Sequence, residues 1–144
     1  MEITIGKSAE IIEQAQAIRF QVFTVEQNIP NELDLDGLDS VSVHALVKDN
    51  EQAVATARLV VKKDNSSVMA RVAVLEAYRG NGIASKVVNT LVEHAKRIGV
   101  SSIEIHAHSY LQNYYEKFGF EFIQEVEVVG EHQLIEMRNY IART

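Results

Sequence analysis

The most informative stretch of the chain reads Arg79-Gly80-Asn81-Gly82-Ile83-Ala84. It follows an apolar, strand-like run at residues 72–75 and leads into a helical pattern. The first N–H groups of a helix have no intrahelical partners and lie at the positive end of the helix dipole, so they can bind an anion. Gly80 and Gly82 let the backbone approach that anion closely, and Arg79 adds a fixed positive charge. The stretch therefore predicts a phosphate-binding loop.

The segments on either side of this loop predict an α+β fold. After the loop, apolar residues recur at helical spacing up to Ile98, Gly99 ends the helix, and residues 101–107 alternate as a strand. Strand, loop, helix and strand in this order form one βαβ crossover. Further strands are predicted at residues 3–5, 42–48, 53–62, 68–75, 122–129 and 133–140, and further helices at residues 8–23 and 110–118. The three strands between residues 42 and 75 read as an antiparallel meander.

Composition limits the kind of protein. A chain of 144 residues that is 47% hydrophobic and 24% charged fits a single domain, residues 1–144, with a sizeable core. The absence of cysteine excludes disulfides, cysteine-ligated metals and a thiol nucleophile. A net charge of −6 argues against general binding to nucleic acid. Because no signal-peptide layout and no apolar run of about 20 residues is found, we expect a cytoplasmic protein without a membrane partner.

Two motifs in the chain resemble those of the GNAT N-acetyltransferases. Arg79, Gly82 and Ala84 match the family pattern Arg/Gln-x-x-Gly-x-Gly/Ala after a strand, and residues 115–120 look like its Tyr-x-x-x-Gly-Phe segment. Their order and spacing together are far more specific than either motif alone. The pattern Arg19-x-x-Val22-Phe23-x-Val25-Glu26-Gln27, with a late His132, is similar to the ElaA-like branch. The resemblance implies a mixed, mostly antiparallel central sheet flanked by helices, with a βαβ crossover that binds acetyl-CoA.

This resemblance also implies an activity and a donor site. Acetyl-CoA would be the co-substrate, and its acetyl group would pass directly to the amine of a small molecule or a peptide. The pyrophosphate would rest on the loop, the pantetheine arm would run beside the preceding strand, and the Val74 N–H would bond the thioester carbonyl oxygen. The expected donor-binding residues are Val72, Ala73, Val74, Arg79, Gly80, Asn81, Gly82, Ile83, Ala84, Asn113 and Tyr115.

Catalytic roles are assigned by the same resemblance. Tyr115 matches a tyrosine that can protonate the departing thiolate, although a partly buried tyrosine that only packs its helix on the sheet is the usual alternative. His108 is a candidate general base because imidazole titrates near neutral pH, and it alternates with His106 on one face of a strand. A histidine on a strand is more often structural. The base therefore stays open, with further candidates at Glu26, His44 and His132.

The acceptor site is expected where the family usually builds it. The substrate-binding candidates are Arg19, Phe23, Glu26, Gln27 and His106. We expect no metal, because His106 and His108 with one more histidine do not give a defined third and fourth ligand. A homodimer is common in the family, and we carry it as an expectation.

Two other functions compete with the acetyltransferase interpretation. A dinucleotide-binding oxidoreductase needs Gly-x-Gly-x-x-Gly after a strand, but here Ser85 stands in the third position. The P-loop pattern ending in Gly-Lys-Ser/Thr is absent from the sequence. A non-catalytic acetyl-CoA sensor is the stronger rival. Tyr115 favours the enzyme, since a protein that only binds the donor needs no acid beside the sulfur.

Overall fold

The computed structural model describes residues 1–141. Its strands form one seven-stranded sheet in the order β1-β2-β3-β4-β5-β7-β6. The strands are β1 (Glu2–Gly6), β2 (Val43–Asp49), β3 (Gln52–Val61), β4 (Ser66–Val74), β5 (Ser102–His108), β6 (Glu121–Val129) and β7 (His132–Asn139). The α-helices are α1 (Ala9–Arg19), α2 (Asn31–Asp34), α3 (Ile83–Ile98) and α4 (Gln112–Glu116). Short 3₁₀ turns are η2 (Asp39–Val41), η3 (Glu76–Tyr78) and η4 (Ser109–Leu111), and η1 (Phe20–Glu26) is a π-helix.

The predicted fold class is confirmed. Among the strand pairs whose register is described, four are antiparallel: β1 with β2, β2 with β3, β5 with β7, and β6 with β7. Strands β4 and β5 are parallel, with partners from Ser66 opposite Ser102 to Val68 opposite Glu104. Helix α3 lies between these two strands in the chain, so β4, α3 and β5 are the expected βαβ crossover.

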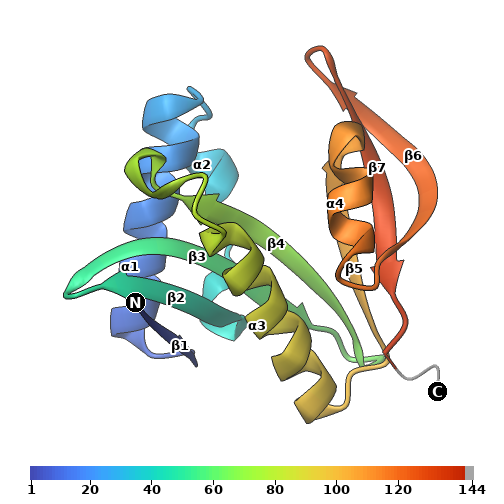
Figure 1. The fold of residues 1–144 in the computed structure, drawn as a ribbon, viewed down its shortest axis with the longest axis horizontal. Helices are drawn as coiled ribbons and strands as arrows, with labels where there is room; N and C mark the ends of the chain where they lie inside the picture. Colours follow the sequence, from blue (N-terminus) through green and yellow to red (C-terminus); the bar gives the residue numbers. More distant parts are fainter. Residues whose placement is uncertain (142–144) are drawn as a thin grey trace. The chain divides into compact units, whose positions relative to one another are not determined.

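The chain divides into two compact units, of which the first comprises residues 1–60 and 71–91. It contains the antiparallel strands β1, β2 and β3 as neighbours (Figure 1). Ser8 caps α1 by accepting a hydrogen bond from the Ile11 N–H at 3.2 Å, as predicted. A core cluster of four buried side chains joins α1 and η1 to β2 and β4, and consists of Ile18, Val22, Leu46 and Ala73.

The second unit comprises residues 61–70 and 92–144, of which 142–144 lie outside the description. Here β6 and β7 form a long hairpin, and β7 lies between β6 and β5 (Figure 1). Buried apolar residues of β5 and β7, such as Ile103, Ile135 and Met137, supply much of this unit's core. Strand β6 lies at one edge of the sheet, and eight of its nine residues are exposed.

One helix differs from its sequence prediction. Apolar spacing predicts a continuous helix over residues 8–23, but the α-helix ends at Arg19 and a seven-residue π-helix follows. A π-helix bonds i to i+5, so its turn is wider than that of an α-helix. The wider turn changes which side chains reach the core: Val22 is buried, whereas Phe20 and Val25 are exposed. Apolar spacing of 3.6 residues cannot reveal such a change, because core packing decides it.

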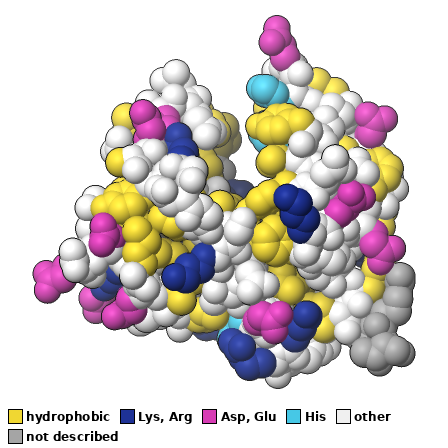
Figure 2. Space-filling model, viewed as in Figure 1, with side chains coloured by type: hydrophobic (Ala, Val, Ile, Leu, Met, Phe, Trp, Pro, Cys, Tyr) yellow, Lys and Arg dark blue, Asp and Glu magenta, His cyan; other side chains and the backbone are white. Residues whose placement is uncertain are grey.

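The described surface mixes several kinds of side chain. On the face shown in Figure 2, acidic and basic side chains are interspersed, with hydrophobic side chains exposed between them. Within residues 1–141, no helix has both the length and the apolar character that crossing a bilayer requires.

Candidate active site

The glycine loop adopts the backbone conformation that its residues predict. Gly80 and Gly82 have φ of +84° and +75°, in the left-handed region that disfavours side chains. A Cβ added at either glycine would meet no atom within 4 Å. In this structure the glycines are therefore required by backbone angle, and the space beside them is open to an incoming group. Helix α3 starts directly after them, where the Lys86 N–H donates to the Gly82 carbonyl oxygen at 3.1 Å.

The strand before the loop carries the other predicted donor-binding residues of this unit. Ala73 and Val74 are buried, and Val72 is partly exposed. Arg71, the residue before them, has φ of +60°, which is unusual for a residue other than glycine and marks a local break in the extended strand. The strand ends at Val74, after which the Leu75 N–H donates to the Val54 carbonyl oxygen at 2.9 Å.

Arg79 joins two predicted parts of the site. Its Nη2 lies 2.8 Å from Oε1 of Glu26, the last residue of η1, and its Nε donates to the Val74 carbonyl oxygen at 2.9 Å. A residue predicted to bind the acceptor is thereby paired with a residue predicted to bind the donor. The sequence analysis expects the positive charge of Arg79 to face a phosphate, but in this structure the Glu26 carboxylate already balances that charge.

Arg19, predicted to bind the acceptor, is 1% exposed and belongs to a buried ion-pair network. Its guanidinium contacts Asp34 at 2.9 Å and Asp39 at 2.8 Å. Arg58 also pairs with Asp39, at 3.1 Å. Because its donors are taken up by these carboxylates, Arg19 cannot meet an acceptor without leaving them. Its direct contact with substrate stays a prediction, and the structure favours a role in positioning the segment after η1.

Sequence reasoning missed this network, which we call the Asp34–Asp39 network. It also includes Arg71 and Asp36, since Nη2 of Arg71 lies 3.2 Å from Oδ2 of Asp36. Burial opposes ionisation of Asp39, but hydrogen bonds from Arg19 and Gln16 outweigh it and hold the pKa of Asp39 far below its usual range. The one sequence feature that could have indicated the network is the closely spaced acids at positions 34, 36 and 39. Closely spaced acids are usually exposed to solvent, so this feature alone does not predict burial.

The remaining predicted acceptor residues of the first unit differ in exposure. Phe23 is partly buried and packs against the core cluster of Ile18, Val22, Leu46 and Ala73, so it contributes to the core as well as to the surface. Gln27, the residue after η1, is exposed. Their contact with a substrate stays a prediction.

In the second unit, Tyr115 lies on α4 and is 8% exposed. Its ring makes edge contacts with Tyr114 and Phe120, at centroid distances of 5.1 and 5.9 Å. Burial raises the pKa of Tyr115 to about 12, with a smaller contribution from Tyr114. The phenol is therefore protonated throughout the neutral range. Asn113, on the same helix, is exposed.

His108 ends β5 within a group of three rings. It stacks on Tyr110 at a centroid distance of 5.3 Å and meets the edge of His132 at 4.8 Å. His108 Nδ1 is buried without a hydrogen-bond partner among the described residues. His106 is exposed instead, and its Nε2 lies 3.1 Å from Oε2 of Glu104.

Comparison with known proteins identifies the family to which the chain belongs. The sequence profile of the acetyltransferase (GNAT) family matches residues 10–120, which include all of α1 but its first residue, the glycine loop and Tyr115. The chain belongs to the GNAT family. It is an N-acetyltransferase by this membership, and the match spans residues of both compact units.

Three relatives show how this GNAT chain compares with others. It is 31% identical over 127 residues to the uncharacterized N-acetyltransferase YjcF of Bacillus subtilis, covering 88% of this chain and 90% of that protein. It is 34% identical over 113 residues to protein ElaA of Escherichia coli, covering 76% and 74%. The crystal structure of ElaA superposes with a TM-score of 0.85 at 29% identity, covering 96% of this chain and 98% of that one. An acyl-CoA N-acyltransferase from Pseudomonas aeruginosa superposes with a TM-score of 0.86 at 27% identity, covering 96% and 98%.

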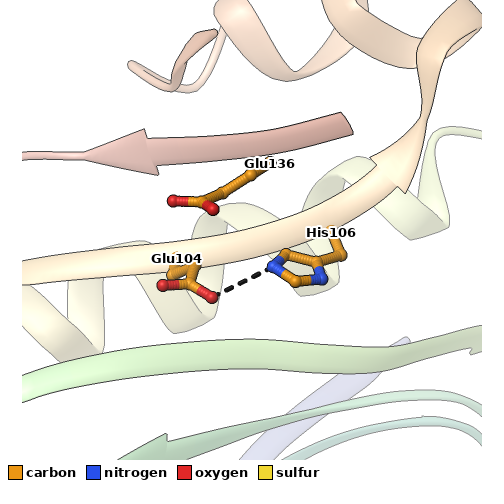
Figure 3. A group of neighbouring side chains, drawn as sticks. All are labelled: Glu104, His106 and Glu136. Atoms are coloured by element: carbon orange, nitrogen blue, oxygen red, sulfur yellow. Dashed lines mark hydrogen bonds and ion pairs between the residues drawn. The ribbon is translucent and has the colours of Figure 1, made fainter. Parts of the chain in front are cut away.

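One further cluster of this GNAT chain has ligand atoms close enough for a metal ion. Glu104 and His106 from β5 and Glu136 from β7 place one ligand atom each within 4.8 Å of the others (Figure 3). Arg138 contacts both carboxylates, each at 2.9 Å. Hydrogen bonding from Gln124 and Arg138 lowers the pKa of Glu136 despite its burial. A cation would have to displace Arg138, so the cluster is better described as an ion-pair network, which the sequence analysis did not foresee.

Proposed function

We propose that this N-acetyltransferase uses acetyl-CoA and transfers the acetyl group directly to an amine. The observation that carries the proposal is the loop of residues 79–84, where two glycines in left-handed conformation open onto the N-terminus of α3. The open space beside both glycines fits a bulky anion such as a pyrophosphate. The similarity to an acyl-CoA N-acyltransferase at 27% identity supports the same donor class.

The residues of this loop and of β4 would divide the binding of the donor. The N–H groups of residues 79–84 would hold the pyrophosphate, with the guanidinium of Arg79 at its edge. Backbone groups of residues 72–74 would bind the pantetheine arm as an added strand would. Acetyl-CoA supplies a thioester, whose carbonyl oxygen gains negative charge during amine attack. The Val74 N–H would stabilise that charge by hydrogen bonding.

Tyr115 would act at the leaving sulfur. Amine attack forms the new C–N bond, the C–S bond breaks, and the thiolate needs a proton to leave as a thiol. With a pKa of about 12, Tyr115 carries a proton at its Oη. Because a free thiol has a pKa of about 8.5, the phenol is the weaker acid, and we expect it to act first as a hydrogen-bond donor to the sulfur.

For the general base we propose His108. Its side chain is partly exposed at the end of β5, so the imidazole could take the proton that an ammonium acceptor must lose. His44, another candidate, is fully buried, and its Nε2 already contacts the Asp39 carbonyl oxygen at 2.9 Å. Burial also lowers the pKa of His44, which weakens it as a base. Glu26 and His132 remain alternatives, since both have exposed or partly exposed side chains.

The proposal also covers domain organisation, location and assembly. We propose that residues 1–144 act as one acetyltransferase domain in the cytoplasm, with a homodimer as the expected assembly. The single seven-stranded sheet supports the one-domain interpretation.

Thiol release tests the proposal. The protein is incubated with acetyl-CoA and a panel of amines comprising a polyamine, an aminoglycoside, a peptide with a free N-terminus and a lysine peptide, and free thiol is followed by a chromogenic disulfide. The proposal expects release above the acetyl-CoA hydrolysis rate with at least one amine, together with an acetylated product by mass. Binding of acetyl-CoA without release for any amine would instead identify a non-catalytic sensor.

A further inference from the structure

The pairing of Arg79 with Glu26 has a consequence for donor binding. Two different nitrogens of Arg79 are used: Nη2 contacts Glu26 at 2.8 Å, and Nε contacts the Val74 carbonyl oxygen at 2.9 Å. The guanidinium can therefore keep its bond to the end of β4 while Nη2 changes partner. Its side chain is 43% exposed and that of Glu26 is 22% exposed, so both can be reached by solutes.

The same guanidinium lies at the first residue of the anion-binding loop. A pyrophosphate on this loop and the carboxylate of Glu26 are both anions, and both favour the planar donor fork of an arginine. Holding the two anions around one cation costs like-charge repulsion, more so where protein displaces water. An ion pair that solvent can reach is held weakly, so its exchange needs little energy.

We propose that Glu26 is a latch on Arg79: its carboxylate holds Arg79 Nη2 in the free protein and gives it up to the pyrophosphate of the donor. This rests on the proposed function. The exchange leaves Glu26 unpaired at the end of η1, next to the exposed Gln27. An unpaired carboxylate there attracts an ammonium group, so donor binding prepares the site for a cationic acceptor. Glu26 is a positioning residue that acts through Arg79.

Calorimetric titration of coenzyme A into three proteins tests the latch. In Glu26→Gln the competing negative charge is gone, and coenzyme A should bind about two- to fivefold more tightly than to the wild type. Glu93→Gln removes the same charge from the exposed pair with Lys96, whose atoms are 3.4 Å apart, and controls for the change in net charge. Its affinity should stay within about 1.5-fold of the wild type.

A second ligand separates the latch from a structural effect. S-acetylpantetheine lacks the pyrophosphate, so its affinity should be equal for the wild type and Glu26→Gln. Glu26→Ala should reproduce the tighter binding of coenzyme A if the glutamine variant folds poorly, with thermal melting as the check on folding.

Weaker binding of coenzyme A to both Glu26 variants overturns the latch, because the carboxylate would then orient Arg79 for the pyrophosphate. Equal binding overturns it too, because the carboxylate would then not compete with the pyrophosphate. An equal gain for S-acetylpantetheine overturns it as well. Failure of the wild type to bind coenzyme A at all would count against the proposed function itself, which keeps the two failures distinguishable.

Discussion

Tyr115 is buried, and its position in the motif predicts a role as proton donor to the leaving sulfur. Its pKa of about 12 means that it stays protonated at every pH at which the protein is expected to work. A proton donor that never ionises in the working range gives no pH limb of its own, so its role must be seen by substitution. Sequence alone could place this tyrosine, because the Tyr-x-x-x-Gly-Phe segment is local. The direction of its pKa shift could not be read, since burial depends on packing from distant residues.

Tyr115→Phe removes the phenol proton and leaves the ring contacts. We expect kcat to fall about 10²-fold or more, while the KM for acetyl-CoA changes by less than about threefold, because the lost hydrogen bond matters mainly when charge develops on sulfur. Steady-state thiol release measures both constants. Tyr110→Phe is the matched control, since Tyr110 is 71% exposed and outside the motif. A kcat within twofold of the wild type would remove Tyr115 from the reaction.

The raised pKa of Tyr115 also predicts how stability depends on pH. The folded protein keeps the proton more tightly than the unfolded chain, whose tyrosines titrate near pH 10. The stabilisation is therefore fully present below about pH 10 and is lost as pH rises toward about 12. Urea unfolding should show a loss of about 2–3 kcal/mol over that window for the wild type and a smaller loss for Tyr115→Phe. Parallel pH curves for the two proteins would contradict this.

Among the elements, the segment from η1 to β2 departs most from the sequence prediction. A helix was foreseen where α1 continues into a π-helix, and nothing foresaw the Asp34–Asp39 network. Both outcomes depend on partners far along the chain: Leu46 and Ala73 pack against η1 and α1, and Arg58 and Arg71 pair with the aspartates. Local periodicity carries no information about such partners. The glycine loop was foreseen because its turn and helix start are encoded by neighbouring residues.

The Asp34–Asp39 network should be costly to break. Asp39→Asn removes the carboxylate that Arg19 and Arg58 share, so that Arg19 keeps only Asp34 and Arg58 keeps only Asp36 as a charge partner. Because the lost partner is buried, we expect the free energy of unfolding to fall by about 3 kcal/mol. The lowered pKa of Asp39 means that its stabilisation is present above about pH 4 and is lost as pH falls, so the variant should show a flatter acid limb.

Chemical denaturation between pH 2 and pH 7 measures both effects. Glu93→Gln, at an exposed pair, should stay within about 0.5 kcal/mol of the wild type. A loss below 1 kcal/mol for Asp39→Asn, or an unchanged acid limb, would show that the network contributes little.

For the whole molecule, element order could be predicted but sheet order could not. The meander, the βαβ crossover and the two final strands follow from local signals, and all are present. The position of β7 between β5 and β6 depends on which strands pair across long sequence separations, which turn signals do not specify. The family follows from two local motifs, whereas the acceptor would be set by side chains from several separate segments. The part of the mechanism that local sequence encodes is therefore the binding of the donor's pyrophosphate by the backbone of residues 79–84.

Amide NMR during a titration with coenzyme A tests that claim most directly. The protein is labelled with ¹⁵N, and the shift of every assigned N–H is followed as coenzyme A is added, then as S-acetylpantetheine is added to a second sample. We predict that the largest changes with coenzyme A fall on the N–H groups of residues 79–84, and that the ligand without pyrophosphate leaves these groups nearly unmoved. Binding of coenzyme A with its largest changes outside this loop would contradict the account.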